Sequence, residues 1–226
     1  ELPLVSISDS QRRPLPWCNW ANTVYHGLPK DLYKFNAEPG KYLAFLGRVS
    51  PEKCPDQAIE LAKRVGLPLK MAAKVDPADR AYFERVVEPL LDHPLVEFVG
   101  EITDAEKSDF IGNAIGLICP YDWPEPFGLV LIESLACGTP VLAYRRGSIP
   151  EIIGHGVTGF ISENLDEMVS QVAKLGTIDR HRCRQVFDER FTAQRMTHDY
   201  VKIYQQLITD AAAFPGKTGQ QHASNL

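Results

Sequence analysis

The stretch AIGLICPYDWPEPFGLVLIESLACGTPVLAY, Ala114 to Tyr144, decides the fold. It holds two short apolar runs, 114–120 and 140–144, which have the length of buried strands. Between them the residues from Phe127-Gly128 onward predict a helix that is apolar nearly all round. A strand, a helix and a second strand in this order form a βαβ unit, whose strands are parallel. The stretch therefore predicts one unit of a parallel sheet.

The same alternation extends to both sides of this unit. Further strands are predicted at 42–47, 68–75, 96–100 and 157–161, with helices at 56–65, 78–91 and 104–113. Thr103 and Glu106 are spaced as a capping box at the start of the third of these helices. Parallel strands separated by helices predict an α/β domain with a doubly wound parallel sheet covered on both faces. Three more helices, at 164–175, 179–189 and 195–213, predict a helical C-terminal end.

The two ends of the chain do not follow this alternation. Residues 1–24 contain a strand and a short helix, which we interpret as the remnant of a preceding N-terminal domain and a linker. The chain starts at Glu1 without an initiator Met, so we expect the earlier part of a longer protein to be absent. The doubly wound domain is predicted at 25–213, and a polar tail at 214–226.

The composition excludes few functions. The 226 residues carry a formal charge of −5, which argues against a nucleic-acid partner. Five scattered cysteines without a CxxC pair form neither a disulfide framework nor a zinc site, and they fit a reducing compartment. No apolar stretch could span a bilayer and no signal peptide is present, so the expected location is cytoplasmic.

Glu133 is the only charged residue between Pro126 and Tyr144. Because an unpaired buried carboxylate costs several kcal/mol, Glu133 should have a donor partner. Two sugar hydroxyls of a ligand would serve, and so would a structural cap or an ion pair with a neighbouring Arg. The spacing leaves these alternatives open.

Glu125 and Gly128 lie on the loop that follows the 114–120 strand. In open α/β sheets, ligands bind in the crevice outside the carboxyl ends of the strands, which places Glu125 beside that crevice. Gly128 leaves the N–H groups at the helix start uncovered, a setting that favours an anion such as phosphate. A glutamate near a helix N-terminus can equally be a simple partner of the helix dipole.

Arg48 and Lys53 leave the carboxyl end of the first main strand, in GRVSPEK at 47–53. Two cations at the crevice suit a diphosphate, because Arg grips oxygens in bidentate fashion and Lys acts as a point charge. Taken alone they could be solvated surface charges. Gly147-Ser148, in RRGSIPEIIGHGVTGF at 145–160, could lie against a ligand or simply form a turn. His155 reads as a surface or turn residue.

Taken in order, GRVSPEK, VEFVGEIT, EPFGLVLIE, SLACGTPVLAYRRGSIPEII and HGVTGF resemble the C-terminal domain of family 4 (group 1) glycosyltransferases of the GT-B fold. The similarity runs from about residue 41 through the final long helix. One departure is Cys54, where the family commonly has Gly, which should restrict that loop.

The resemblance implies roles that spacing alone does not show. Glu125 would contact the transferred sugar, Glu133 would bind the ribose hydroxyls, and Arg48 and Lys53 would neutralise the departing diphosphate. Gly47 would line the donor site. Backbone amides at Phe127, Gly128 and Leu129 would hold sugar and phosphate oxygens, and Gly100 to Ile102 would meet the base. Transfer would retain the anomeric configuration, with no metal and no cofactor beyond the donor substrate.

The implied partners are a nucleotide sugar linked to UDP, GDP or ADP and an N-terminal acceptor domain of the same protein. Membrane association is expected only through that missing domain, and the chain by itself should bind nucleotide but transfer sugar poorly. Three alternatives remain: a GT-B nucleotide-sugar epimerase, a plain dinucleotide-binding module, and a non-catalytic binding domain. GRVSPEK lacks the GxGxxG of the second. The four residues Arg48, Lys53, Glu125 and Glu133 speak against the third.

Overall fold

The structure is a computed structural model, and it describes residues 2–213. The predicted tail at 214–226 therefore lies outside the described residues. The strands are β1 (Leu4–Ser6), β2 (Trp20–Thr23), β3 (Tyr42–Arg48), β4 (Leu69–Lys74), β5 (Val96–Gly100), β6 (Ala114–Cys119), β7 (Val141–Tyr144) and β8 (Gly159–Ser162). The α-helices are α1 (Asp9–Arg12), α2 (Pro55–Val65), α3 (Arg80–Tyr82), α4 (Asp104–Gly112), α5 (Leu129–Ala136), α6 (Ile149–Ile152), α7 (Leu165–Val172), α8 (Arg180–Arg190) and α9 (Ala193–Ala213).

The main sheet has six parallel strands in the order β5-β4-β3-β6-β7-β8. From β3 the chain winds outward to β4 and β5, then crosses back to β6 and winds to β7 and β8. The winding direction therefore reverses between β3 and β6, which are neighbours. This arrangement is the doubly wound sheet that the sequence predicts, and its switch point lies between β3 and β6.

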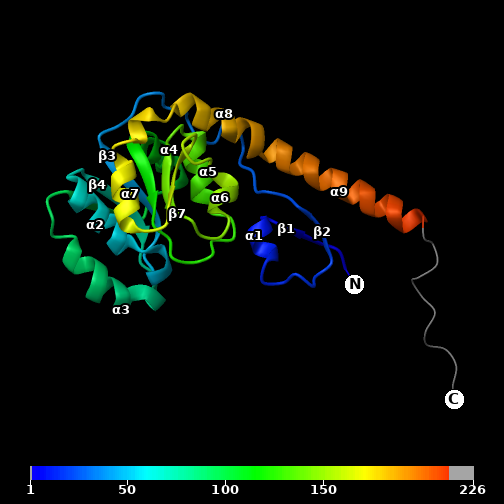
Figure 1. Cartoon of the computed structure of the whole chain (residues 1–226), viewed down its shortest axis with the longest axis horizontal. Coiled ribbons are helices and arrows are strands. Elements are labelled where there is room, and N and C mark those ends of the chain that lie inside the picture. The colour runs from blue at the N-terminus through cyan, green and yellow to red at the C-terminus, as the bar shows by residue number, and fades with distance from the viewer. Residues whose placement is uncertain (1, 214–226) are drawn as a thin grey trace, which may run out of the picture.

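Helices cover both faces of this sheet (Figure 1). Helices α2 and α7 pack against each other on one face, and α5 and α8 pack against each other on the other. The core between them holds fully buried side chains from several strands and from α5, among them Leu43, Phe45, Leu117, Leu131 and Leu142. The prediction that α5 is an interior helix is confirmed from Leu131 onward, whereas Leu129 is 47% exposed.

Most predicted element boundaries agree to within two residues, and the capping box at α4 is confirmed, since the Glu106 carboxylate accepts from the Thr103 N–H at 2.8 Å. The predicted helix at 78–91 is wrong as one continuous element. That segment consists of short 3-10, α and π turns from Pro77 to Leu90. Pro89 lies inside the segment and supplies no N–H, so a regular helix cannot continue through it.

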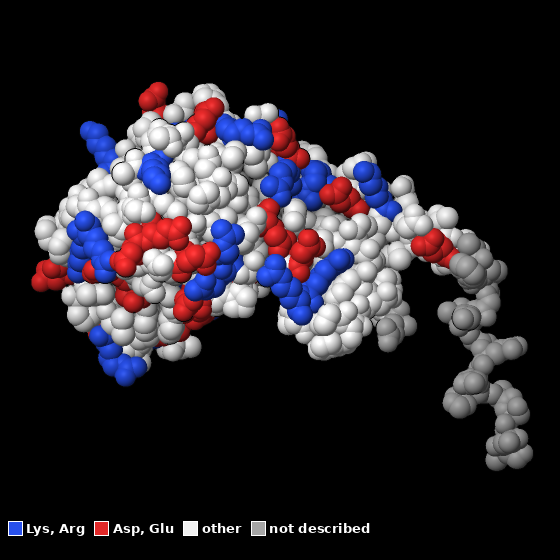
Figure 2. Space-filling view, in the orientation of Figure 1, with Lys and Arg blue, Asp and Glu red and all other residues white. Residues whose placement is uncertain are grey.

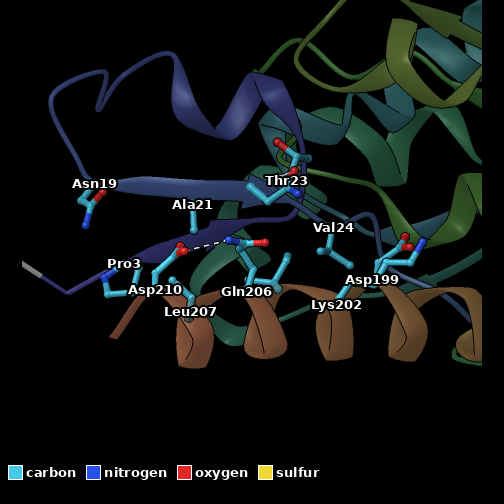
Figure 3. A pocket seen from close by; sticks show the side chains of 12 residues that line it. Pro3, Asn19, Ala21, Thr23, Val24, Asp199, Lys202, Gln206, Leu207 and Asp210 are labelled. Carbon is cyan, nitrogen blue, oxygen red and sulfur yellow. Dashed lines mark hydrogen bonds between the residues drawn. The ribbon is translucent and has the colours of Figure 1, made fainter. Parts of the chain in front are cut away.

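The first residues form a small unit of their own. Strands β1 and β2 pair in parallel as a two-stranded sheet, and α1 connects them. Helix α9 runs past this unit (Figure 1). Between β2 and α9 lies a hollow of about 830 Å³, which is lined by Lys202 and Gln206 of the helix and by Ala21 and Thr23 of the strand (Figure 3).

Charged side chains of both signs are interleaved on the face seen in Figure 2. Across residues 2–213, no helix is long and apolar enough to cross a membrane.

Candidate functional site

The candidate residues gather at the carboxyl edge of the main sheet. Gly47 and Arg48 end β3, Lys53 follows β3, and Glu125 follows β6. Since β3 and β6 are the neighbours at the switch point, Lys53 and Glu125 come from the two strands that flank it. The strand order therefore explains why two residues 72 positions apart in the chain can meet.

Lys53 and Glu125 form an ion pair, with the ammonium directly against one carboxylate oxygen. The Trp123 indole N–H donates to that same oxygen at 3.0 Å. The ammonium also lies 4.0 Å from the centre of the Tyr121 ring and 5.3 Å from that of Trp123, so two aromatic faces attract it. Both charged side chains are largely buried, at 18% and 10% exposure. This group, Lys53, Tyr121, Trp123 and Glu125, is called the lysine cage below.

Arg48 does not join the lysine cage. Its guanidinium lies among three carboxylates, 2.7 Å from Glu52, 3.8 Å from Asp76 and 3.5 Å from Asp79. The side chain is 48% exposed, so these contacts are solvated and individually weak. Arg48 is therefore at the predicted edge of the sheet, but it would have to exchange partners to reach an anion beside Lys53.

Glu133 has protein donors, which answers in part the question left open by the sequence. Lys107, on α4, donates to the Glu133 carboxylate at 3.2 Å and to Asp104 at 2.9 Å. Burial, together with the charge of Glu133 and a hydrogen bond to it, raises the pKa of Tyr33. Burial lowers the pKa of Lys107, but its hydrogen bond to Asp104 and the charge of Glu133 outweigh that effect and raise the pKa overall. The partner of Glu133 is thus a lysine and a phenol, not an arginine.

The turn before α5 has its carbonyl groups occupied. The carbonyls of Glu125, Pro126 and Phe127 accept from the Ser148 N–H at 2.9 Å, the Ser8 hydroxyl at 2.6 Å and the Ser148 hydroxyl at 3.0 Å. The first N–H groups of an α-helix have no acceptor within the helix. The turn is therefore fixed from its carbonyl side, while its N–H side, at Phe127 to Leu129, is the side available to an anion.

Glycines shape this turn at two points. Gly128 has φ +80°, the left-handed region that favours glycine, and it is the N-cap of α5. Gly147 has φ +54°, and a Cβ built there would lie 2.3 Å from the Glu125 carbonyl oxygen. The Gly147 backbone therefore packs closely against the Glu125 turn. That Gly147 also lies against a ligand stays a prediction.

Gly100 ends β5 and Ile102 follows it, at the far end of the same edge. Gly100 has φ +83° with open space where a Cβ would stand, and Ile102 packs against the core. The segment leads into α4, which carries Lys107, so it lies on the side of the site where Glu133 is found.

Cys54 is the one non-glycine residue with a positive φ in the described chain, at +50°. An L-residue in this conformation carries a cost of roughly 1–2 kcal/mol. Cys54 thus holds a backbone conformation that suits glycine, and this is the physical form of the restriction expected for the loop after Lys53.

Three residues at the site were not predicted from the sequence: Lys107, Tyr121 and Trp123. Lys107 looks like any solvated lysine on the polar side of a helix, and only the packing of α4 against α5 brings it to Glu133. Trp123 had a weak signal, an aromatic residue two positions before Glu125 in a loop at the carboxyl edge. The described residues contain no group of three or more His, Cys, Asp or Glu side chains arranged to hold a metal.

A six-stranded, doubly wound parallel sheet with acidic and basic side chains at its switch point defines a Rossmann-like α/β domain. Residues 32–186 match the family model of glycosyl transferases group 1, and the chain belongs to this family.

Curated relatives agree with this assignment. The chain is 36% identical over 94 residues to N-acetyl-alpha-D-glucosaminyl L-malate synthase of Bacillus anthracis, covering 38% of this chain and 25% of that protein. It is 25% identical over 202 residues to an uncharacterised glycosyltransferase of Methanocaldococcus jannaschii, covering 84% and 54%. The chain therefore spans about half or less of the length of these relatives.

Solved structures share the fold at low identity. Sucrose-phosphate synthase from Thermosynechococcus elongatus superposes with a TM-score of 0.78 at 20% identity, over 92% of this chain and 59% of that one. AviGT4, a glycosyltransferase involved in avilamycin A biosynthesis, gives 0.75 at 22%, over 91% and 64%. The Anabaena protein HepE, solved with UDP and glucose, gives 0.74 at 18%, over 92% and 62%. The GT-B type of fold expected from the sequence is confirmed.

Proposed function

We propose that this chain is the donor-binding part of a retaining glycosyltransferase and that it binds a nucleotide diphosphate sugar at the carboxyl edge of its sheet. One observation carries the proposal: the two glutamates that begin and end EPFGLVLIE each pair with a lysine, Glu125, before α5, with Lys53 and Glu133, within α5, with Lys107. Carboxylates suit the hydroxyl groups of a sugar and a ribose, and the ammonium groups and helix N–H groups suit the phosphates between them.

In this proposal the diphosphate lies between the two glutamates. Lys53 leaves Glu125 for a phosphate oxygen, and Glu125 then accepts from the hydroxyls of the transferred sugar. Arg48 joins Lys53 by exchanging its exposed carboxylate partners for the diphosphate. Neutralising the charge that develops on the leaving diphosphate is the main electrostatic contribution to breaking the glycosidic bond. Gly47, next to Arg48, leaves this part of the edge open to the ligand.

The other end of the donor binds beside Glu133. The ribose hydroxyls donate to its carboxylate, and the base meets the segment from Gly100 to Ile102. The amides at Phe127, Gly128 and Leu129 hold sugar and phosphate oxygens. No metal is required, because the two basic residues supply the positive charge.

We further propose that residues 1–24 belong to a second, acceptor-binding domain. Two strands of parallel sheet are too few to form a core, and parallel sheets are normally covered on both faces. The matched part of this chain covers 54% or less of the relatives named above, which leaves room for such a domain. The hollow between β2 and α9 (Figure 3) is a place where its remaining elements would pack. The isolated chain then binds donor but transfers sugar poorly or not at all, and measurable turnover by the 226-residue chain would contradict this part.

The test is calorimetric titration of the chain with UDP, GDP and ADP, repeated with the Glu133→Ala variant. Binding of one nucleotide, weakened in the variant, is the expected result, and the ribose assignment predicts weakening of every nucleotide that binds. Unchanged affinity in the variant would refute that assignment, and no binding of any nucleotide would refute the proposal. Incubating the longer protein with donor and analysing the product by NMR separates transfer with retention from epimerisation of the free donor.

A further inference from the structure

Glu151 joins the N-terminal unit to the main domain. Its carboxylate oxygens accept from two consecutive backbone N–H groups of α1, Asp9 and Ser10, both at 2.8 Å. The Tyr25 hydroxyl donates to the same carboxylate at 3.2 Å. Glu151 lies on α6, more than 120 residues away from each of these partners in the chain. One side chain thus ties together a helix of the N-terminal unit, the segment after β2 that contains Tyr25, and α6 of the main domain.

The partners of Glu151 leave little freedom in how α1 sits. The N–H groups at the start of a helix lack intrahelical acceptors, and a carboxylate that accepts from two of them fixes both position and direction. Arg190, on α8, adds a hydrogen bond to the Glu151 carbonyl at 2.8 Å, which holds the backbone that carries the carboxylate.

Docking of α1 has a direct effect at the donor site. Ser8, the N-cap of α1, is fully buried, and its hydroxyl donates to the Pro126 carbonyl at 2.6 Å. Pro126 immediately follows Glu125. If α1 shifts, the turn between Glu125 and Phe127 loses the central one of its three carbonyl hydrogen bonds.

We propose that Glu151 is a positioning residue for Glu125. It fixes α1 so that Ser8 can hold the Pro126 carbonyl, and through that turn it sets where the Glu125 carboxylate stands. The relevance of Glu125 to sugar transfer rests on the function proposed above, whereas the path from Glu151 through Ser8 to the turn rests only on the contacts.

The experiment compares three variants of the full 226-residue chain, Glu151→Gln, Ser8→Ala and the control Glu60→Gln. Glutamine has the shape of glutamate but one carbonyl oxygen, so it can serve only one of the two α1 N–H groups. Glu60 pairs with Arg64 on the outer surface, which makes its change a matched loss of a carboxylate away from α1. Amide hydrogen exchange and the indole ¹H–¹⁵N signals are recorded by NMR, where three tryptophans give three indole signals.

Amide exchange should be about tenfold faster in Glu151→Gln at Asp9 or Ser10, at the one N–H that loses its acceptor, and unchanged at both in Glu60→Gln, because a hydrogen bond to a charged group is lost. The Trp123 indole signal, which reports the hydrogen bond to Glu125, should shift in both Glu151→Gln and Ser8→Ala. Faster exchange without a shift of Trp123 would show that Glu151 only docks α1, and would overturn its positioning role. Unchanged amide exchange at both Asp9 and Ser10 would show that Glu151 does not fix α1, and would overturn the proposal.

If Glu151→Gln does not fold, Ser8→Ala still decides the positioning step through the Trp123 signal. These readouts need no ligand. If the wild-type chain binds no UDP, the proposed function is refuted. The positioning role of Glu151 is still tested, because the amide exchange at Asp9 and Ser10 and the Trp123 signal are measured without UDP.

Discussion

The ammonium of Lys53 contacts the carboxylate of Glu125 directly, so the residue proposed to bind the diphosphate and the residue proposed to bind the transferred sugar neutralise each other. The pair is largely buried, and the Trp123 indole N–H holds the same carboxylate oxygen at 3.0 Å. An anion that approaches Lys53 must therefore compete with Glu125. The affinity for a nucleotide should therefore depend on the strength of the Lys53–Glu125 ion pair.

Glu125→Gln should bind UDP without sugar more tightly than the wild type does. The substitution removes the negative charge that competes for Lys53 and keeps an acceptor for Trp123, so the dissociation constant should fall by roughly threefold to tenfold, a change of about 1 kcal/mol. Isothermal titration calorimetry measures it, and raising the salt concentration should reduce the gain.

The matched control for Glu125→Gln is Glu60→Gln, whose carboxylate pairs with Arg64 on the outer surface. Its UDP affinity should equal that of the wild type. An unchanged or weaker affinity in Glu125→Gln would mean that Lys53 does not exchange Glu125 for phosphate.

Gly147→Ala should lower the free energy of unfolding more than Gly66→Ala does. Both glycines have a positive φ, but only Gly66 has free space around it. Gly66 has φ +68° with nothing within 4 Å of a built Cβ, whereas at Gly147 the Cβ would stand 2.3 Å from the Glu125 carbonyl oxygen. Left-handed strain should cost roughly 1–2 kcal/mol in both variants. The close contact at Gly147 should add roughly 1–3 kcal/mol.

Urea unfolding of Gly147→Ala and Gly66→Ala gives the difference between the two free energies of unfolding. Equal losses of stability would show that the backbone at Gly147 moves aside easily. The Glu125 turn would then not depend on the close approach of the 145–148 loop.

The sequence predicts the sheet and the position of most candidate residues because both follow from local patterns. Apolar runs mark the strands, and strands that are parallel must bring their carboxyl ends to one edge, where Lys53 and Glu125 belong. The pairings within that edge depend on distances between separate helices. Lys107 meets Glu133 only through the packing of α4 beside α5, and no periodicity in either helix encodes that contact. The same holds for Glu151, whose partners in α1 and at Tyr25 come from a part of the chain with no regular alternation.

Thiol reactivity should separate Cys18 from the other four cysteines. Burial raises the pKa of Cys54 to about 11 and those of Cys119, Cys137 and Cys183 to about 12, while Cys18 is partly exposed. Because the thiolate is the reactive form, at about pH 8 a disulfide reagent such as DTNB should modify Cys18 quickly and the other thiols only after unfolding. Cys18→Ser should abolish the fast phase.

The same pKa shifts predict that the chain loses stability at alkaline pH. The folded pKa values of the four buried thiols lie above the ordinary value of 9.0, so their contribution to stability is fully present below pH 9.0. It is lost as the pH rises towards about 12. Rapid modification of several thiols in the native chain at about pH 8 would contradict the burial of this core.

Lys107→Met should lower the stability of the chain and at the same time strengthen nucleotide binding. The substitution leaves the buried Glu133 carboxylate with fewer donors, at a cost of roughly 1–3 kcal/mol. Ribose hydroxyls would then supply the missing donors without displacing an ammonium, so the melting temperature should rise more with UDP in the variant than in the wild type.

Because the pKa of Lys107 is raised above 10.5, the difference in stability between wild type and variant should be constant below pH 10.5 and shrink above it. Lys174→Met, on an exposed lysine, is the control and should change neither stability nor the response to UDP. If Lys107→Met loses stability but shows no larger response to UDP, Glu133 is a structural partner of α4 and not the ribose ligand.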